Sequence, residues 1–269
     1  FKERREKGII DIYYSHIAMP SHVEVTEPPK EDSYKYLIGS TRSKTIKGDF
    51  RLSPHLLVAG QSGGGKSNLL KQIITCLYLN NKTAKFTLVD LKEGLEFQVY
   101  KDVERINVVE EFDSILSKVA TLDKEMTRRM KIIKGHDCKD IDAYHKKMKN
   151  DRSKRLDRHF ICIDEAAEIF LATSGEKTEK VQKARKGLSR MARLGRACGV
   201  HLIIATQRPD VKAVDPQVKA NLTSIVCFQM PNLASSMTVL SNGRAAHLPS
   251  ETPGCLLYTS DAADERSWG

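Results

Sequence analysis

The chain alternates between short apolar runs and longer amphipathic segments. The runs span five to seven residues, are rich in β-branched side chains and are bounded by polar or glycine-containing turns, which favours buried strands. The predicted strands are residues 55–59 (HLLVA), 85–91 (KFTLVDL), 160–164 (FICID), 200–206 (VHLIIAT) and 224–230 (SIVCFQM). Because helical patterns separate them, we predict an α/β fold with a mostly parallel sheet and helices on both faces.

Three segments carry apolar residues at the three- and four-residue spacing of a helix. One follows Lys66 and continues to Leu77, and a second, longer one begins near Phe112 and includes Ile115 to Met126. A third, from Val181 to Cys198, sets an apolar stripe against a stripe of lysine and arginine. All three are expected to cover the sheet.

The two ends of the chain differ from its centre. Residues 1–35 include a strand-like IIDIYY and then three prolines within MPSHVEVTEPPKEDS, which indicates an extended connector. Residues 36–258 are expected to form one domain, opened by a hairpin around Gly39 and Gly48. Residues 259–269 are small, polar and acidic, and we expect an irregular tail. Since the chain starts at Phe1, we expect a fragment of a longer protein, with an upstream membrane anchor left open.

The net charge indicates the kind of partner, and the cysteines indicate the cellular compartment. Lysine and arginine (44) outnumber aspartate and glutamate (34), so the net charge of +10 attracts polyanions such as nucleic acid or an anionic membrane. A solvated basic surface is the alternative, and the location of the charge decides between them. The six cysteines contain no C-x-x-C pair, which favours a reducing, cytosolic compartment without structural zinc.

A glycine-rich stretch between the first strand and the first helix fits G-x-x-x-x-G-K-[ST]. Glycines let backbone N–H groups surround phosphate, Lys66 can reach the β- and γ-phosphates, and the Ser67 hydroxyl can ligate Mg²⁺. The residues expected around ATP are Gly60, Gln61, Ser62, Gly63, Gly64, Gly65, Lys66, Ser67 and Asn68. A glycine-rich turn without a ligand is the alternative.

An acidic pair follows the third apolar strand. Asp164 and Glu165 would stand at the carboxyl edge of the sheet, where parallel α/β sheets bind ligands. We predict that Asp164 holds Mg²⁺ and that Glu165 polarises the attacking water. Without the phosphate loop upstream, such a pair would often be a helix cap.

Two further strand ends carry polar residues. IIATQRPD places Gln207 where its amide could sense the γ-phosphate or its water, although a polar strand end turned by Pro209 is the alternative. The second strand ends with Asp90, Lys92 and Glu93. Two interpretations of these residues stay open, namely a role at the edge of the site and simple solvation.

Six ordered segments resemble the FtsK/SpoIIIE family of DNA translocases. They are HLLVAGQSGGGKS, DLKEGLEFQVY, EMTRRMKII followed by IDAYHKK, ICIDEAAEIF, ARLGRACGVHLIIATQRP and VKANLTSIVCFQM. The resemblance runs from about Tyr36 to Tyr258. It implies a RecA-like P-loop motor domain that forms a hexameric ring, threads double-stranded DNA and turns over ATP with Mg²⁺.

The resemblance also assigns roles. It makes Gly65, Lys66 and Ser67 the phosphate loop, Asp164 and Glu165 the acidic pair, and Gln207 the sensor. Arg196 falls where such motors carry an arginine before the sensor strand, so it is the first candidate for a finger supplied to a neighbouring subunit. Arg193 and Arg208 compete with it, and an intrasubunit salt bridge is the alternative for Arg196.

Two basic segments are candidates for DNA contact. They are Lys146–Arg158 and Thr173–Gly187, and the lysines that we single out are Lys146, Lys147, Lys177, Lys180 and Lys183. Movement that ignores sequence requires contacts with the phosphate backbone. For both segments the alternative is a solvated surface without a ligand. Our hypothesis is that the second segment enters the central pore of the ring.

The leading hypothesis is an ATP-driven translocase of double-stranded DNA, serving conjugative transfer or chromosome partitioning. We favour the conjugative or mobile-element branch because no winged-helix module follows the motor. A secretion-system ring ATPase that moves proteins is one alternative. A nucleotide-gated assembly platform with little hydrolysis is another, although Lys66, Asp164 and Glu165 argue against it. The expected location is the cytoplasm or the cytoplasmic face of a membrane.

Overall fold

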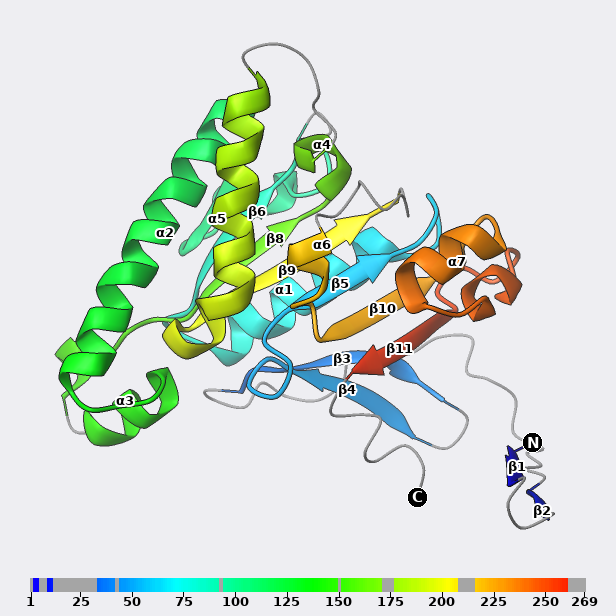
Figure 1. The fold of residues 1–269 in the computed structure, drawn as a ribbon, viewed down its shortest axis with the longest axis horizontal. Helices are drawn as coiled ribbons and strands as arrows, with labels where there is room; N and C mark the ends of the chain where they lie inside the picture. The colour runs from blue at the N-terminus through cyan, green and yellow to red at the C-terminus, as the bar shows by residue number, and fades with distance from the viewer. Residues whose placement is uncertain are drawn as a thin grey trace.

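A seven-stranded sheet forms the centre of the protein in the computed structural model (Figure 1). The structure describes residues 2–4, 9–11, 33–41, 44–91, 94–149, 151–170, 177–207 and 216–260. The strands are, in spatial order, β11 (Leu256–Ser260), β10 (Ser224–Phe228), β5 (Leu56–Ala59), β9 (Val200–Thr206), β8 (His159–Ile163), β6 (Lys85–Val89) and β7 (Ile106–Val109). All neighbours pair in parallel except β10 and β11. The predicted α/β class is confirmed.

The five strands predicted from apolar runs all form, and two more join them. The β7 strand is short and only partly buried, so INVV gives no clear apolar run. The β11 strand pairs antiparallel with β10 and continues to Ser260, two residues past the domain boundary predicted at 258. Both strands lie at the edges of the sheet, where one neighbour is missing and the apolar signal is weaker.

Two layers of helix and hairpin bury the sheet on its two faces. Alternate residues of β5 point to opposite sides, so Leu57 and Ala59 join one core whereas Leu56 and Val58 join the other. On the first face lie α2 (Phe112–Gly135) and α5 (Lys177–Cys198), side by side in Figure 1. On the second face lie α1 (Lys66–Asn80) and the hairpin of β3 (Lys35–Ser40) and β4 (Thr45–Asp49).

The remaining elements are short. They are β1 (Lys2–Arg4), β2 (Ile9–Asp11), η2 (Gln98–Tyr100), α3 (Ile141–Lys147), η3 (Arg152–Lys154), α4 (Ala166–Phe170), α6 (Pro216–Lys219), α7 (Leu233–Leu240) and η4 (Arg244–His247). No helix in the described part of the chain is both long and apolar enough to span a bilayer. All six cysteines lie among the described residues, and each is a free thiol.

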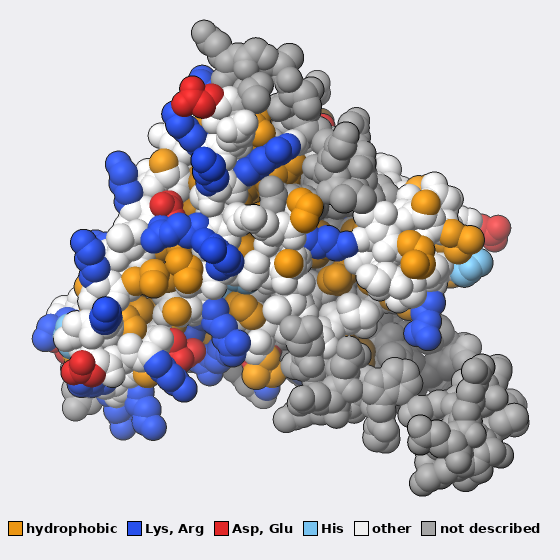
Figure 2. All heavy atoms as spheres, viewed as in Figure 1, with side chains coloured by type: hydrophobic (Ala, Val, Ile, Leu, Met, Phe, Trp, Pro, Cys, Tyr) orange, Lys and Arg blue, Asp and Glu red, His pale blue; other side chains and the backbone are white. Residues whose placement is uncertain are grey.

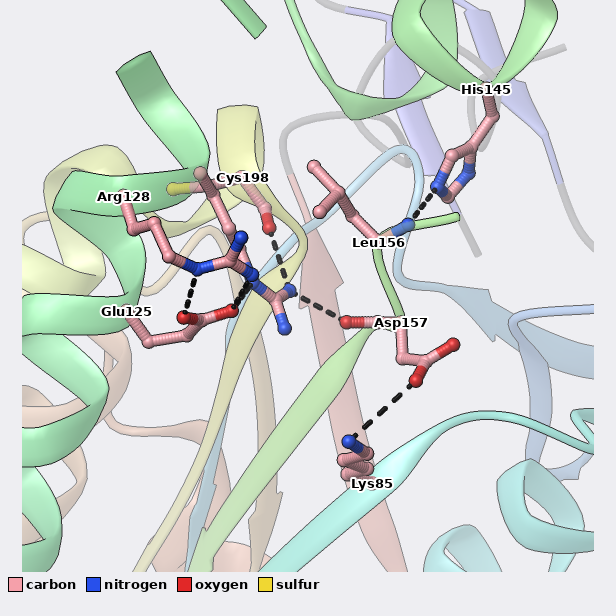
Figure 3. Close-up of polar contacts among 8 residues, drawn as sticks. Lys85, Glu125, Arg128, His145, Leu156, Asp157 and Cys198 are labelled. Carbon is pink, nitrogen blue, oxygen red and sulfur yellow. Dashed lines mark hydrogen bonds and ion pairs between the residues drawn. The ribbon is translucent and has the colours of Figure 1, made fainter. Parts of the chain in front are cut away.

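A buried arginine fastens α2 to the amino edge of the sheet. Arg129 donates from Nη1 to the carbonyl oxygens of Asp157 (2.6 Å) and Cys198 (3.1 Å), which precede β8 and β9. Its Nε donates to Glu125 Oε1 at 2.8 Å, and the exposed Arg128 shares that carboxylate. Figure 3 shows this group, with Asp157 also reaching Lys85 on β6. The contacts set the start of the strand that delivers Asp164.

A second buried cluster lies at the same edge. Arg158 donates to Asp142 Oδ1 at 2.6 Å on α3, and its Nη1 lies 3.0 Å from Nε2 of His201. Because Nδ1 of His201 faces the Pro54 carbonyl at 2.9 Å, the proton sits on Nδ1 and Nε2 accepts from Arg158. Burial lowers the pKa of His201 well below its ordinary value, and the ring stays neutral. Phe160 stacks on it with centroids 5.0 Å apart.

Candidate nucleotide-binding site

The glycine-rich loop lies between β5 and α1, as the sequence predicts, and its backbone needs glycine. Gly60, Gly63 and Gly65 have φ values of 152°, 76° and 110°, which other residues rarely adopt. A Cβ at Gly60 would lie 2.6 Å from the Cβ of Phe228, at the end of β10. Phe228 therefore packs directly beneath the loop, and the loop can present backbone N–H groups only because its glycines carry no side chains.

The side chain of Lys66 folds back over the loop. It is 4% exposed, and its Nζ donates to the Gln61 carbonyl at 3.0 Å. A backbone carbonyl is a weaker partner for an ammonium group than a phosphate oxygen is. The position of Lys66 is therefore compatible with exchange of this carbonyl for the β- and γ-phosphates.

Two distant segments hold the loop from the side of β10 and β11. The Gln229 carbonyl accepts from the Gln61 N–H at 3.0 Å, and the two side-chain amides contact each other. Gly254, in the turn before β11, donates to the Gly64 carbonyl at 3.1 Å. Sequence reasoning missed Gln229 and Gly254, because no local signal marks residues that meet the loop only through strand pairing.

The acidic pair stands at the same sheet edge, with β9 between it and the loop. Thr206 donates to Glu165 Oε1 at 2.7 Å, and the Gln207 N–H donates to Oε2 at 2.9 Å. The Thr206 carbonyl accepts from the Gly60 N–H at 3.3 Å. The Glu165 carboxylate, 3% exposed, is thus fixed by the strand that adjoins the phosphate loop. The Gln207 side chain keeps its sensor role as a prediction.

The residues present suit ATP with Mg²⁺. Ser67 lies in the first turn of α1 and Asp164 directly follows β8, so a hydroxyl and a carboxylate stand on the two sides of the site. These are hard oxygen donors, which Mg²⁺ prefers. The glycine loop described above suits the phosphates, because the positive φ values of Gly60, Gly63 and Gly65 allow backbone N–H groups to turn toward a bound anion at the start of α1.

Asp90 organises the loop after β6. It is fully buried, and its Oδ2 accepts from the N–H groups of Glu96 (2.8 Å) and Phe97 (3.1 Å). Of the two predictions for Asp90, simple solvation is therefore wrong, because the side chain is buried and holds the loop. Lys92 and Glu93 lie outside the described residues.

Arg196, the first candidate for the finger, lies away from the phosphate loop of its own chain. Arg196 is exposed near the end of α5, and its Nη2 donates to the Arg51 carbonyl at 3.4 Å. That position is at the amino end of β9, whereas the phosphate loop is at the carboxyl end of β5 beside it. Any contact between Arg196 and a γ-phosphate would have to involve another subunit. Arg193 is also exposed on α5, and Arg208 lies outside the described residues.

The predicted DNA-binding lysines fall on two helices. Lys146 and Lys147 are exposed on α3, and Lys147 donates to the His136 carbonyl at 2.7 Å. On α5, Lys180 pairs with Asp113 and Lys183 with Glu179, each at 2.8 Å. The side chain of Lys177 lies outside the described residues. Arg158, which ends the first basic segment, is buried and therefore cannot reach DNA.

Known proteins are similar to this chain in sequence and in fold. The DNA translocase FtsK of Campylobacter jejuni is 33% identical over 196 residues, which cover 71% of this chain and 20% of that protein. The chain thus spans about a fifth of the length of this relative.

Two solved structures have the same fold. The pCW3 conjugation coupling protein TcpA, in a monomer form with ATPγS, is 31% identical with a TM-score of 0.82, over 91% of this chain and 68% of that one. The cytoplasmic domain of the type VII secretion ATPase EccC of Thermomonospora curvata is 22% identical, with a TM-score of 0.73 over 91% of this chain and 30% of that one. The predicted RecA-like P-loop ATPase fold is confirmed.

A model of the FtsK/SpoIIIE family matches residues 30–211, which include the phosphate loop, the acidic pair and Gln207. The resemblance read from the six ordered segments is therefore correct, and the chain belongs to the FtsK/SpoIIIE family of P-loop ATPases.

Proposed function

We propose that this chain is the motor domain of an ATP-driven translocase of double-stranded DNA that works as a ring hexamer. One observation carries the catalytic part. Glu165 is held by Thr206 and Gln207, and Thr206 also contacts the first glycine of the phosphate loop. This arrangement joins a water-activating carboxylate to a triphosphate cradle, which a pure binding module does not need.

Each side chain then has a defined part in hydrolysis. Lys66 would leave the Gln61 carbonyl and bind the β- and γ-phosphates. Ser67 and Asp164 would hold Mg²⁺, whose charge would offset that of the phosphates. Glu165 orients the attacking water and accepts its proton, and Gln207 senses the γ-phosphate from the end of β9. Movement of Gln207 would pass the state of the nucleotide to the segment that follows β9.

The DNA assignment rests on family membership and on the distribution of charge. Lysine and arginine side chains follow α2 and α5 over the face in Figure 2, which fits backbone contacts that ignore sequence. We call the exposed lysine and arginine residues of these two helices the basic face; they include Lys124, Lys131, Lys183, Lys186 and Arg193. The 31% identity with the conjugation coupling protein TcpA favours a role in conjugative transfer. A place at the cytoplasmic face of a membrane is part of the same proposal.

Displacement of a third strand from a DNA triplex tests the proposal. We expect the protein with ATP to strip the third strand from a long duplex, and Glu165→Gln to bind ATP without stripping. ATP turnover that duplex DNA leaves unchanged, together with no displacement, would favour a motor for protein cargo. ATP binding with negligible turnover under all conditions would favour an assembly platform.

A further inference from the structure

Strand pairing brings a glutamine from the far end of the chain against the start of the phosphate loop. In the parallel pair of β5 and β10, which stand side by side in Figure 1, Ala59 lies opposite Cys227. The same register, continued by two residues, brings Gln61 of the loop opposite Gln229. The Gln61 N–H donates to the Gln229 carbonyl at 3.0 Å, so main-chain pairing continues past the end of β5.

The side chains of these two glutamines also meet. The amide NH₂ of Gln61 donates to the side-chain oxygen of Gln229. On its other side, the Gln61 main-chain carbonyl accepts from Lys66 Nζ at 3.0 Å and from the Gly64 N–H at 3.3 Å. Gln61 is therefore held from β10 by main chain and side chain, and its carbonyl in turn holds the lysine and the bend of the loop.

Gln229 is itself held in place by its two chain neighbours. Phe228 is 2% exposed, and a Cβ added at Gly60 would lie 2.6 Å from its Cβ. Met230 is 1% exposed, and its N–H donates to the Ala245 carbonyl at 3.0 Å. Gln229, in contrast, is only partly buried. A side chain that fills little of the core but meets the phosphate loop is better placed to shape the site than to stabilise the fold.

A glycine-rich loop gains more than other loops from such an external contact. The stretch GQSGGG, residues 60–65, contains four glycines, and glycine loses more conformational freedom on ordering than any other residue. If a nucleotide has to order this loop, the lost entropy weakens binding, whereas contacts within the protein that order it in advance strengthen binding. The contacts between Gln229 and Gln61 are of the second kind.

We propose that Gln229 is a positioning residue for ATP binding, which acts through Gln61 to hold the phosphate loop and Lys66 in the shape that receives the triphosphate. Gln229 contacts no reacting atom in this role. Its contribution is equal in the ground state and the transition state, since the loop keeps one shape around the bound phosphates. Such a uniform contribution changes KM and leaves kcat unchanged. The inference rests on ATP binding as given in the proposed function, and on no step that involves DNA.

Near-isosteric substitutions test the pair, with all constants measured at one protein concentration and without DNA. Gln229→Met and Gln61→Met each keep the length of the side chain and remove its amide, while the main-chain contact remains. Each is expected to raise KM for ATP and the Kd of a fluorescent ATP analogue about three- to tenfold, the effect of one lost hydrogen bond. The value of kcat should stay within about twofold. Gln182→Met, at an exposed glutamine of α5, is the matched control and should leave all three constants unchanged.

The double variant shows whether the two glutamines act as one unit. If they do, removing both amides should raise Kd no more than removing one, whereas residues that act separately would multiply their effects. Hydrogen exchange gives a readout independent of turnover. Gln229→Met should exchange faster than the unmodified chain in residues 60–67 alone, and the two proteins should exchange equally there once a non-hydrolysable ATP analogue is saturating.

Three results would overturn the role of Gln229. They are unchanged KM and Kd in Gln229→Met, a fall in kcat at unchanged KM, and a loss in the double variant that equals the product of the two single losses. Failure of the proposed function looks different, because the unmodified chain would then fail to bind the ATP analogue. Tight and equal binding by the unmodified chain and by Gln229→Met would refute the role of Gln229 and leave the proposed function standing.

Discussion

The two edges of one sheet use buried polar groups for different purposes. At the amino edge, Arg129 and Arg158 contact two backbone carbonyls, two carboxylates and a histidine nitrogen, all of which belong to the fold. At the carboxyl edge, Lys66 donates to a carbonyl of the glycine-rich loop, and Glu165 is held by strand β9 beside that loop.

The difference shows that burial of a charge does not by itself mark a functional site. Arg129 and Lys66 are almost equally buried. What distinguishes Lys66 is its place in a loop whose geometry requires glycine, next to a carboxylate that a second strand positions. A charge that fixes strands can be removed only at a cost in stability, whereas a charge that serves a ligand can be removed at a cost in activity.

The sharpest contrast should come from Glu165→Gln. Turnover is expected to fall about 10²–10⁴-fold, because the amide cannot accept a proton from water. The amide oxygen can still accept from the Gln207 N–H, and the Thr206 hydroxyl can rotate to accept from the amide NH₂, so the free energy of unfolding should change little. Glu168→Gln, on the exposed side of the short helix α4 that follows Glu165, is the control and should keep full turnover. Equal turnover in Glu165→Gln would refute the assigned base.

At the amino edge, Arg129→Ala should lower the free energy of unfolding by about 3–5 kcal/mol, because buried carbonyls lose their donor. Arg128→Ala removes an exposed partner of the same Glu125 carboxylate and should cost no more than about 1 kcal/mol. Chemical denaturation measures both. A small effect of Arg129→Ala, or a similar effect of the two substitutions, would show that the amino edge is not the structural anchor that we describe.

Lowering the pH should reduce the free energy of unfolding through a buried histidine at the amino edge, His55. Burial lowers the pKa of His55 to about 4, so the unfolded chain binds its proton near pH 6.5 and the folded chain does not. Stability from neutral His55 is therefore full above pH 6.5 and falls as the pH drops toward 4, by about 2 kcal/mol between pH 7 and pH 5.

A single substitution isolates this effect. His55→Asn keeps an acceptor for the Leu202 N–H and does not titrate, so its stability should depend less steeply on pH. Identical pH dependence of unfolding in the two proteins would remove His55 as the cause.

The smallest effect is expected on DNA affinity, from substitutions on the basic face, which belongs to neither edge of the sheet. Lys183→Glu with Lys186→Glu should weaken duplex binding about tenfold and make the salt dependence of affinity less steep, because fewer counterions are released. Lys146→Glu with Lys147→Glu on α3 is the matched pair from the other basic segment. A larger loss in the α3 pair would move the DNA contact to α3, and unchanged affinity in both would exclude these lysines.

Much of the site at the carboxyl edge could be predicted from local sequence alone. The phosphate loop, Asp164 and Glu165 follow apolar strands, so strand ends could be located from the pattern alone. Gln229 and Gly254 could not be found this way, because they reach the loop only after β10 and β11 have paired with the sheet. The same applies to Arg129, which the helical pattern places on the buried side of α2 and whose partners lie 28 and 69 residues away.

The strands at the sheet edges were harder to predict for a related reason. Central strands are covered on both faces and read as continuous apolar runs, whereas INVV in β7 contains a polar residue and has one neighbouring strand.

ATP turnover measured against protein concentration, with and without long duplex DNA, tests the central claim most directly. If the chain is a ring motor whose site a neighbour completes, turnover should rise more steeply than in proportion to concentration across the assembly range, and duplex DNA should increase it. Turnover that is strictly proportional to concentration and indifferent to duplex DNA would contradict the account.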